Sequence, residues 1–173
     1  MKRKLSILYA WLVRTLTFFL PDISLFMRLR GGLYSFVMKS AGTNFQVAHS
    51  AILNSISELS VGNNVYIANG SSLLCGGGII VSDNVLFGPG VVISSNNHTF
   101  EDETGYRFGK AVFGGVIIGR GSWICANSVI TKGACFPEFS ILGPCSVYNQ
   151  KQQGNNSSLY SGIPAKLIGP ITS

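Results

Sequence analysis

Charged residues and histidines are scarce in this sequence, and each shortage excludes a class of protein. Only 12% of the 173 residues are charged, whereas 46% are hydrophobic, so much of the chain must be buried in a core or at interfaces. The two histidines are His49 and His98. Because a catalytic zinc ion usually takes three protein ligands, two widely separated histidines argue against a three-histidine metal centre, and we expect no metal site.

Motifs for phosphate loops and disulfides are also missing. The glycine-rich segments at residues 76–78 and 88–90 lack the sequence G-x-x-x-x-G-K-[ST], so we interpret them as corner glycines. No two cysteines have C-x-x-C spacing, which argues against disulfides and zinc. We expect buried free thiols, which fit a reducing cytoplasm, at apolar positions of a six-residue repeat. They are Cys75, Cys125, Cys135 and Cys145.

Basic residues are concentrated near the N-terminus. Residues 1–44 hold seven lysines and arginines but a single acid, Asp22, and the remainder of the chain is close to neutral. A nucleic-acid-binding protein would be expected to carry its positive charge on the folded surface together with aromatic residues, so we expect no nucleic-acid partner. A basic segment beside an apolar one suits an anionic membrane surface better.

An apolar run over residues 5–20 follows the first basic residues. It is interrupted by Arg14 and is shorter than the ~20 apolar residues that span a bilayer. We therefore expect residues 1–20 to form a helix that ends near Pro21. Two interpretations stay open at this point: the helix packs on the protein, or it makes a peripheral contact with a membrane.

Small apolar residues recur every six positions from Val61 onward, with a slip of two residues after Leu73. Neither an α-helix nor an alternating strand produces such a rhythm. A six-residue unit fits one short strand plus a corner, and three units close a triangular coil of roughly eighteen residues. The sequence therefore predicts an all-β fold, a β-helix in which the first residue of each unit points inward. These residues are Val61, Ile67, Leu73, Val81, Phe87, Ile93, Ile118, Ile124, Ile130, Phe136 and Leu142.

Several longer motifs carry a family resemblance. They are V-L-F-G-P-G-V-V-I at residues 85–93, the pair Asn97-His98, I-I-G-R-G-S-W-I-C-A-N-S-V-I at 117–130, I-L-G-P-C-S-V at 141–147 and S-G-I-P-A-K-L-I at 161–168. The sequence resembles the hexapeptide-repeat acyltransferases, especially the branch of galactoside, maltose and nodulation O-acetyltransferases. More loosely, residues 29–44 resemble the preamble of the surface-polysaccharide O-acetyltransferases. The resemblance implies a left-handed parallel β-helix.

The expected organisation follows from the repeat and the resemblance together. Residues 1–44 are expected to form an N-terminal helical arm, and residues 45–173 the β-helix domain. The six-residue rhythm stops at His98 and restarts near Gly114, with a polar, acidic and turn-forming segment between them. We expect this segment, residues 99–113, to be a loop extruded from the rigid scaffold, which is a common place for function.

His98 stands at the break in the repeat. Transfer of an acyl group from a thioester to a hydroxyl needs a base that removes the hydroxyl proton, and an imidazole with a pKa near ~6.5 suits this at neutral pH. We therefore predict that His98 is the catalytic base, whereas His49 is structural. A backbone carbonyl, or an acid among Glu101, Asp102 and Glu103, would orient the imidazole.

The resemblance also implies a homotrimer that binds acetyl-CoA in the groove between neighbouring prisms. Positions that match the groove of the family are Trp123, Ala126, Pro144, Asn149, Gln150 and Lys166. The family often has Thr-Lys where this chain has Asn149-Gln150, and alanine where it has Pro144. On the acceptor side, we expect Asn69, Ser71 and Asn97 to bind sugar hydroxyls.

The expected function is transfer of an acetyl group from acetyl-CoA to a sugar hydroxyl, in a cell-surface polysaccharide or its precursor. We expect a cytoplasmic location, with peripheral contact at the inner face of the membrane as one option for the arm. Two alternatives remain: an N-acetyltransferase that acts on an amino sugar nucleotide, and a non-catalytic β-helix scaffold. A γ-carbonic-anhydrase-like enzyme is nearly excluded, because its zinc requires three histidines.

Overall fold

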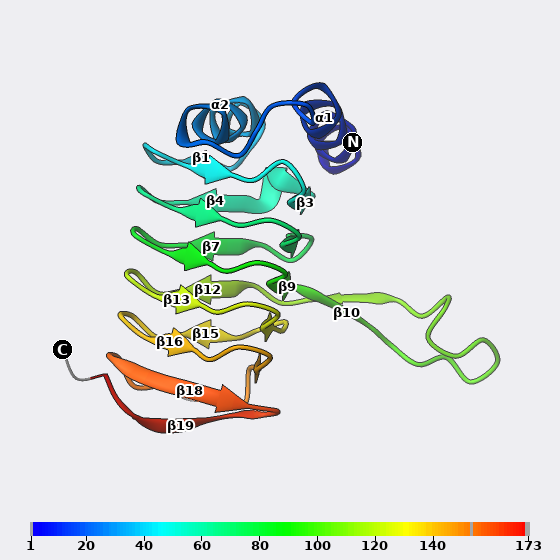
Figure 1. Cartoon of the computed structure of the whole chain (residues 1–173). Coiled ribbons are helices and arrows are strands. Elements are labelled where there is room, and N and C mark those ends of the chain that lie inside the picture. The colour runs from blue at the N-terminus through cyan, green and yellow to red at the C-terminus, as the bar shows by residue number, and fades with distance from the viewer. Residues whose placement is uncertain (1, 153, 172–173) are drawn as a thin grey trace.

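The chain forms a three-sided parallel β-helix of about six turns, with two helices at its N-terminal end (Figure 1). The computed structural model describes residues 2–152 and 154–171. The helices are α1 (Lys2–Leu16) and α2 (Ser24–Ser35). Within the described residues, no helix has the length and apolarity needed to cross a membrane.

Each of the three faces of the prism is one sheet of stacked parallel strands. The first face holds β1 (Ser40–Ala41), β4 (Leu59–Val61), β7 (Ile79–Val81), β12 (Val116–Ile118) and β15 (Cys135–Phe136). The second holds β2 (Gln46–Val47), β5 (Tyr66–Ile67), β8 (Leu86–Phe87), β13 (Trp123–Ile124), β16 (Ile141–Leu142), β18 (Ser158–Gly162) and β19 (Ala165–Pro170). The third holds β3 (Ile52–Asn54), β6 (Ser72–Leu74), β9 (Val92–Ser94), β14 (Val129–Ile130) and β17 (Val147–Tyr148). Among the described strands of these three faces, β19 alone runs antiparallel to its neighbour.

The interior consists of the residues that the six-residue rhythm marks as inward. All eleven have an exposed fraction of 4% or less. They stack on their counterparts one coil away, as Ile67 does on Phe87 and Ile124 on Leu142. The predicted β-helix and its apolar interior are therefore confirmed.

The coils differ in length between the two halves of the prism. Pairing Tyr66 with Leu86 spans 20 residues, whereas pairing Trp123 with Ile141 spans 18. The expected eighteen-residue coil is thus correct only for the C-terminal half. The two extra residues lie in the corner between the third and first faces, which η1 (Ile56–Glu58) occupies in one coil and the glycines at 76–78 in the next.

Two details differ from the sequence-based expectations. The first coil starts with β1 at Ser40, inside the segment assigned to the arm. Cys75 and Cys125 are buried as expected, but Cys135 and Cys145 are exposed, so that prediction is wrong for these two thiols. Cys135 precedes the inward Phe136, and strand alternation points its side chain outward. Cys145 lies at a corner with a φ of 55°.

The two helices are fixed to the first coils by a buried polar cluster. Arg30 of α2 is 1% exposed, and its guanidinium lies 2.7 Å from the Asp22 carboxylate. Asp22 also accepts hydrogen bonds from the backbone N–H of His49 at 2.8 Å and pairs with its Nδ1 at 2.7 Å. Arg30 in turn donates to the carbonyl of Val47 at 3.0 Å. These contacts favour the structural role expected for His49.

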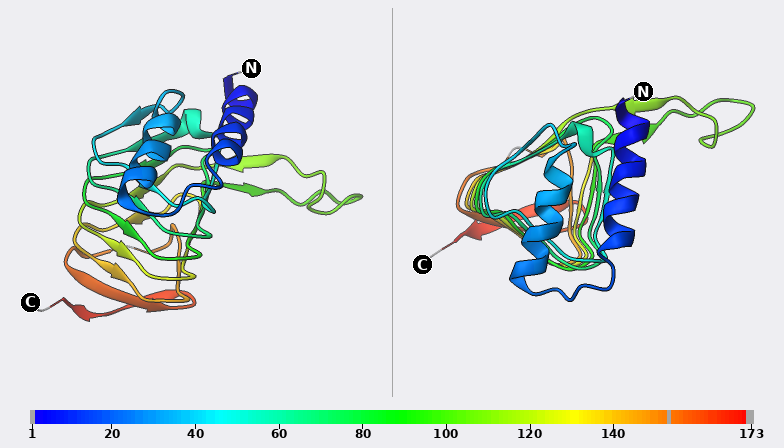
Figure 2. Two further views of the ribbon diagram at one scale, coloured as in Figure 1. Left: turned by 45° about the horizontal axis from the view of Figure 1, so that its top comes forward. Right: turned by 90° about the horizontal axis from the view of Figure 1, so that it is seen from above.

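The break in the repeat is a two-stranded ribbon. β10 (Asn96–His98) pairs with β11 (Ala111–Phe113) in antiparallel register, and the ribbon projects far from the prism (Figure 2). The extruded segment is therefore present, but the departure from the prism begins at Asn96. His98 consequently lies on the ribbon itself, opposite Ala111.

Candidate functional site

The imidazole of His98 is oriented by a backbone carbonyl from the opposite side of the ribbon. Its Nδ1 lies 3.3 Å from the carbonyl oxygen of Gly109, at the long end of hydrogen-bonding distances. This contact favours the tautomer in which Nδ1–H donates and Nε2 keeps its lone pair. Of the orienting groups left open by the sequence, the carbonyl is the one in contact. Glu101 instead accepts a hydrogen bond from the Thr99 hydroxyl at 3.3 Å.

Gly109 permits this arrangement because the two sides of the ribbon approach closely there. A Cβ atom at this position would lie 1.8 Å from the carbonyl oxygen of Thr99. The Thr99 amide in turn donates to the carbonyl of Lys110 at 3.0 Å. The position of the Gly109 carbonyl thus depends on the absence of a side chain.

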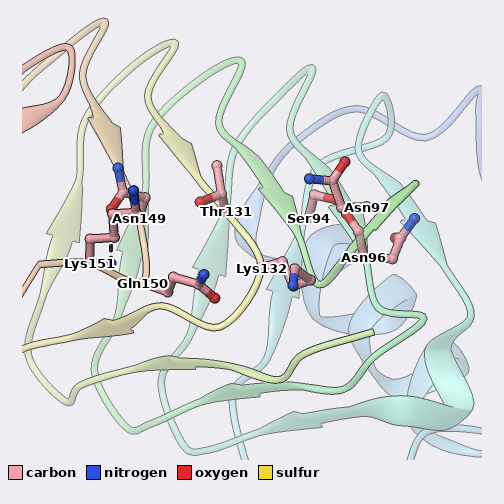
Figure 3. A pocket seen from close by; sticks show the side chains of 8 residues that line it. All are labelled: Ser94, Asn96, Asn97, Thr131, Lys132, Asn149, Gln150 and Lys151. Atoms are coloured by element: carbon pink, nitrogen blue, oxygen red, sulfur yellow. Dashed lines mark hydrogen bonds between the residues drawn. The ribbon is translucent and has the colours of Figure 1, made fainter. Parts of the chain in front are cut away.

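A hollow of about 450 Å³, which we call the C-terminal hollow, lies at the foot of the ribbon (Figure 3). It spans three successive coils at the ends of β9, β14 and β17. Two lysines line it, and none of its lining residues is acidic. The lining residues are Ser94, Asn96, Asn97, Thr131, Lys132, Asn149, Gln150 and Lys151.

Three residues predicted from the sequence meet in this hollow: Asn97, Asn149 and Gln150. The sequence analysis missed its two cations. Lys132 precedes Gln150 by 18 residues, and the register of β14 with β17 places them at equivalent positions of adjacent coils. Reading residues one coil apart as neighbours would have found Lys132.

A second hollow, the N-terminal hollow of about 550 Å³, lies on the other side of the ribbon foot. Asn96 lines both hollows. Because side chains alternate along a strand, His98 projects from the same face of β10 as Asn96. The other lining residues are Arg3, Lys4, Ile7, Asn54, Ser55, Leu74 and Gly76.

Arg3 ties helix α1 to the base of the ribbon. Its guanidinium lies 4.5 Å from the centre of the Phe113 ring, and its Nε donates to the Ser55 hydroxyl at 3.4 Å. Ser55 and Gly76, which lie in the wide corners of the first two coils, line this space between α1 and the ribbon. The N-terminal hollow is therefore basic as well.

The remaining groove positions of the sequence analysis do not line either hollow of this subunit. Ala126 and Pro144 lie at the corner between the second and third faces, where the amide of Cys145 donates to the Ala126 carbonyl at 3.0 Å. Trp123 lies exposed on the second face, and Lys166 lies exposed on β19.

The other two expected acceptor residues lie at that same corner, across the third face from His98. Asn69 is exposed, and its side-chain oxygen accepts a hydrogen bond from the Ser50 hydroxyl at 3.0 Å. Ser71 is fully buried, and its hydroxyl donates to the Gly88 carbonyl at 3.1 Å. Within the subunit, Ser71 therefore has no surface for an acceptor and acts as a corner residue.

Residues 2–152 and 154–171 contain no cluster of potential metal ligands. No group of three or more histidine, cysteine, aspartate or glutamate side chains there is placed to hold an ion. His49 and His98 lie at different corners, one bonded to Asp22 and the other to the Gly109 carbonyl.

Comparison with known sequences gives three informative relatives, although no family model matches the chain. It is 24% identical over 142 residues to the galactoside O-acetyltransferase of Escherichia coli (strain K12), covering 82% of this chain and 68% of that protein. It is 32% identical over 126 residues to the carnitine operon protein CaiE of Proteus sp. (strain LE138), and 30% to that of Salmonella agona (strain SL483). These matches cover 71% of this chain and 63% of each CaiE protein, less than two thirds of their length.

Solved structures show the same fold. A galactoside acetyltransferase in complex with coenzyme A has a TM-score of 0.84 at 20% identity, covering 98% of this chain and 82% of that chain. A hexapeptide-repeat acetyltransferase from Vibrio cholerae, in complex with acetyl-CoA, has a TM-score of 0.78 at 19% identity and covers 98% and 89%. The β-helix accordingly matches the left-handed type expected from the sequence. In sequence and in fold the chain is therefore similar to acetyltransferases of the hexapeptide-repeat type.

Proposed function

We propose that this chain transfers the acetyl group of acetyl-CoA to a hydroxyl of a sugar, with His98 as the catalytic base. The observation that carries the proposal is the position of His98. It stands on the ribbon two residues beyond Asn96, the residue that lines both basic hollows, although His98 itself lines neither. Its Nδ1 is directed at the Gly109 carbonyl, which leaves Nε2 to accept a proton. The relatives support the reaction class, since one is a galactoside O-acetyltransferase and two solved structures hold coenzyme A or acetyl-CoA.

The C-terminal hollow suits the donor. Coenzyme A carries several phosphate charges, and the hollow offers Lys132 and Lys151 as cations without a competing acid. The amides of Asn149 and Gln150 add donors and acceptors for the pantetheine arm. Trp123, Ala126, Pro144 and Lys166 remain proposed contacts in the groove that a second subunit would complete.

The N-terminal hollow suits the acceptor. Asn54 and Asn96 line it, and side-chain amides offer both donors and acceptors to sugar hydroxyls. Asn97 lines the C-terminal hollow and not this one, so it remains a proposed acceptor contact only through its place next to His98. Asn69 remains one only through a neighbouring subunit. We propose that the acceptor is a cell-surface polysaccharide or its precursor.

The chemistry needs one proton to move twice. Nε2 of His98 removes the proton of the sugar hydroxyl as its oxygen attacks the thioester carbonyl. The resulting imidazolium is stabilised by the Gly109 carbonyl, which accepts the Nδ1–H bond. The tetrahedral intermediate then expels the thiolate of coenzyme A, which takes the proton back from His98. The products are the acetyl ester and free coenzyme A.

A substitution at Gly109 tests the orienting contact. In Gly109→Ala, the added Cβ must push against the Thr99 carbonyl, so the Gly109 carbonyl moves away from His98. We expect kcat to fall about tenfold with little change in KM for acetyl-CoA, because only the alignment of the base is lost. Steady-state kinetics of both constants check this split.

Gly32→Ala is the matched control for Gly109→Ala. A Cβ at Gly32 meets no atom within 4 Å, so the same chemical change should leave kcat unaltered. Wild-type kcat in Gly109→Ala would show that the carbonyl does not position His98. The melting temperature does not report on the orientation of His98. The test therefore compares the effect on kcat with the effect on KM.

We also propose that the protein is a closed homotrimer. The ribbon presents exposed Phe100, Tyr106 and Phe108 far from its own prism, which is costly unless another subunit covers them. Trp123 and Leu86 are exposed on the second face as well. In a closed cyclic assembly, the exposed apolar residues of every copy are covered in the same way. Light scattering at micromolar concentration should give three times the mass of the chain, and a monomer there would contradict the proposal.

The acceptor chemistry is tested with matched sugars. Labelled acetyl-CoA is supplied with pairs of glycans that differ only in carrying a hydroxyl or an amino group, and the products are identified by mass spectrometry. The proposal expects ester formation on hydroxyl acceptors. Acetylation confined to amino sugars would instead favour an activity like that of the Bacillus cereus N-acyltransferase AntD, whose solved structure has a TM-score of 0.63 to this chain. Absence of acetyl-CoA binding would favour a scaffold.

A further inference from the structure

Helix α1 buries small side chains and exposes most of its large apolar ones. The residues that it buries against the coils are Ser6, Ala10 and Val13, which are small or polar. Polar contacts hold this face in place: the Ser6 and Ser57 hydroxyls lie 3.4 Å apart, and the Tyr9 hydroxyl donates to the Leu33 carbonyl at 2.8 Å. A helix that only packed on the protein would be expected to direct its largest apolar side chains inward.

The outward face of α1 is its apolar one. It consists of Lys4, Leu5, Leu8, Trp11, Leu12, Thr15 and Leu16, all of which are exposed. Leu8 is 60% exposed and Trp11 54%, although both are among the most apolar residues of the chain. Contiguous exposed apolar surface of this kind marks an interaction site.

Further exposed apolar residues lie on the rest of the cap. Phe19, in the turn after α1, is 89% exposed, and Leu25 of α2 is 68% exposed. Both helices lie at the same end of the prism, opposite the C-terminal hairpin (Figure 1). We call this surface, made of the outward face of α1 together with Phe18, Phe19 and Leu25, the cap face.

Charge decides between the possible occupants of the cap face. The basic residues Lys2, Lys4 and Arg14 lie on or beside it, and the single acid of residues 1–44, Asp22, is held by Arg30 and His49. A second copy docked through the same face would bring these cations together, and the rest of the chain, with six basic and six acidic residues, offers no net negative charge. An anionic lipid surface offers both apolar and negative groups.

We infer that the cap face docks the protein on an anionic lipid bilayer, with α1 lying in the plane of the interface. The small buried residues and the polar contacts beside them keep α1 attached to the coils while its large apolar side chains enter the headgroup region. Helix α1 has 15 residues, which suits an interfacial helix. Docking would place the N-terminal hollow, which α1 borders through Arg3, Lys4 and Ile7, next to the membrane surface.

Vesicle binding of the full chain tests the inference without reference to catalysis. The protein is sedimented with vesicles of phosphatidylcholine alone or with added phosphatidylglycerol, at low and at high salt. We expect binding to the anionic vesicles that high salt weakens. Because each basic residue near such a surface contributes about fivefold, Lys2→Gln with Lys4→Gln should weaken binding about 25-fold.

Trp11 provides a reporter for insertion. The other tryptophan, Trp123, is removed by Trp123→Phe, and the emission of Trp11 is then followed on vesicle addition. Docking predicts a blue shift and quenching by brominated lipid. Binding without any change in Trp11 emission would overturn the inference, because the attraction would then involve charge alone and not the cap face.

The apolar contribution is tested by Leu8→Gln with Trp11→Gln, which should weaken binding at least about tenfold. The matched control is Leu167→Gln with Ile168→Gln, two exposed apolar residues at the opposite end of the prism, which should bind as wild type does. Failure of the wild-type protein to bind anionic vesicles at low salt would contradict the inference. The inference would also be wrong if the protein did not bind vesicles but self-associated, and if the Leu8 and Trp11 substitutions abolished that self-association. Neither result would affect the proposed acetyl transfer, which is measured separately.

Discussion

His98→Ala should lower kcat by about 10²–10⁴-fold, the usual contribution of a positioned general base. The side chain is exposed on the ribbon, and its recorded side-chain contact is to the Gly109 carbonyl. Its removal should therefore leave the melting temperature and acetyl-CoA affinity near their wild-type values. Kinetics at saturating acetyl-CoA, thermal unfolding and calorimetric titration measure the three quantities.

His49→Ala is the natural comparison, because it removes the other histidine. That side chain pairs with Asp22 at 2.7 Å, so we expect a lower melting temperature with kcat preserved at temperatures where the variant is folded. If His98→Ala kept the kcat of the wild type, His98 would not be the base. The same conclusion would follow if His49→Ala, and not His98→Ala, abolished turnover in folded protein.

Arg30→Ala should lower the free energy of unfolding by about 3–5 kcal/mol, because breaking a buried ion pair leaves its partner uncompensated. For a chain of this size that corresponds to a fall in melting temperature of about 6–20 °C. The guanidinium is 1% exposed and joins Asp22 to the Val47 and Leu20 carbonyls, so it links the turn before α2 with the first coil. Thermal unfolding measures the effect.

Arg28→Ala is the control for this prediction, since it removes the same side chain two residues away on an exposed part of α2. A surface change of this kind should alter the free energy of unfolding by no more than about 0.5 kcal/mol. Equal destabilisation by the two substitutions would show that the buried cluster does not hold the cap in place.

Asp22 should make the stability sensitive to acid. Burial raises the pKa of this carboxyl, but hydrogen bonds from His49 and the positive charge of Arg30 outweigh it, so the pKa lies below its ordinary value of 3.8. A carboxyl whose folded-state pKa is lowered stabilises the fold above its unfolded-state pKa, and that stabilisation is lost as the pH falls through the folded-state value. Because His49 makes the larger contributions that lower this pKa, His49→Ala should flatten the stability profile below about pH 4, which thermal unfolding at a series of pH values measures.

The interior of the β-helix could be predicted from the sequence because one rule, an inward residue every six positions, is local and repeats. The interval from Leu73 to Val81 reveals the wider corner, but only the structure shows that the corners of three coils combine with α1 to form a hollow. Lys132 and Lys151 escaped notice because they belong to different coils. They become neighbours of Asn97 only when the coils stack.

The orientation of α1 could not be predicted for a different reason. A hydrophobic pattern assigns the inward face to the most apolar side of a helix, and here that side carries Leu8 and Trp11. Ser6 and Ala10 face the coils instead. The pattern fails because it assumes that the exposed face of a helix meets water. The exposed face of α1 instead suits the lipid bilayer proposed above.

The structure of the protein with bound coenzyme A would test the central claim most directly. We expect the phosphates near Lys132 and Lys151, and the sulfur at the ribbon foot. The sulfur should be close enough to His98, in the same or a neighbouring subunit, for one acceptor hydroxyl to lie between it and Nε2. Coenzyme A bound with its sulfur remote from every His98 in the assembly would contradict the assignment of both the donor site and the base.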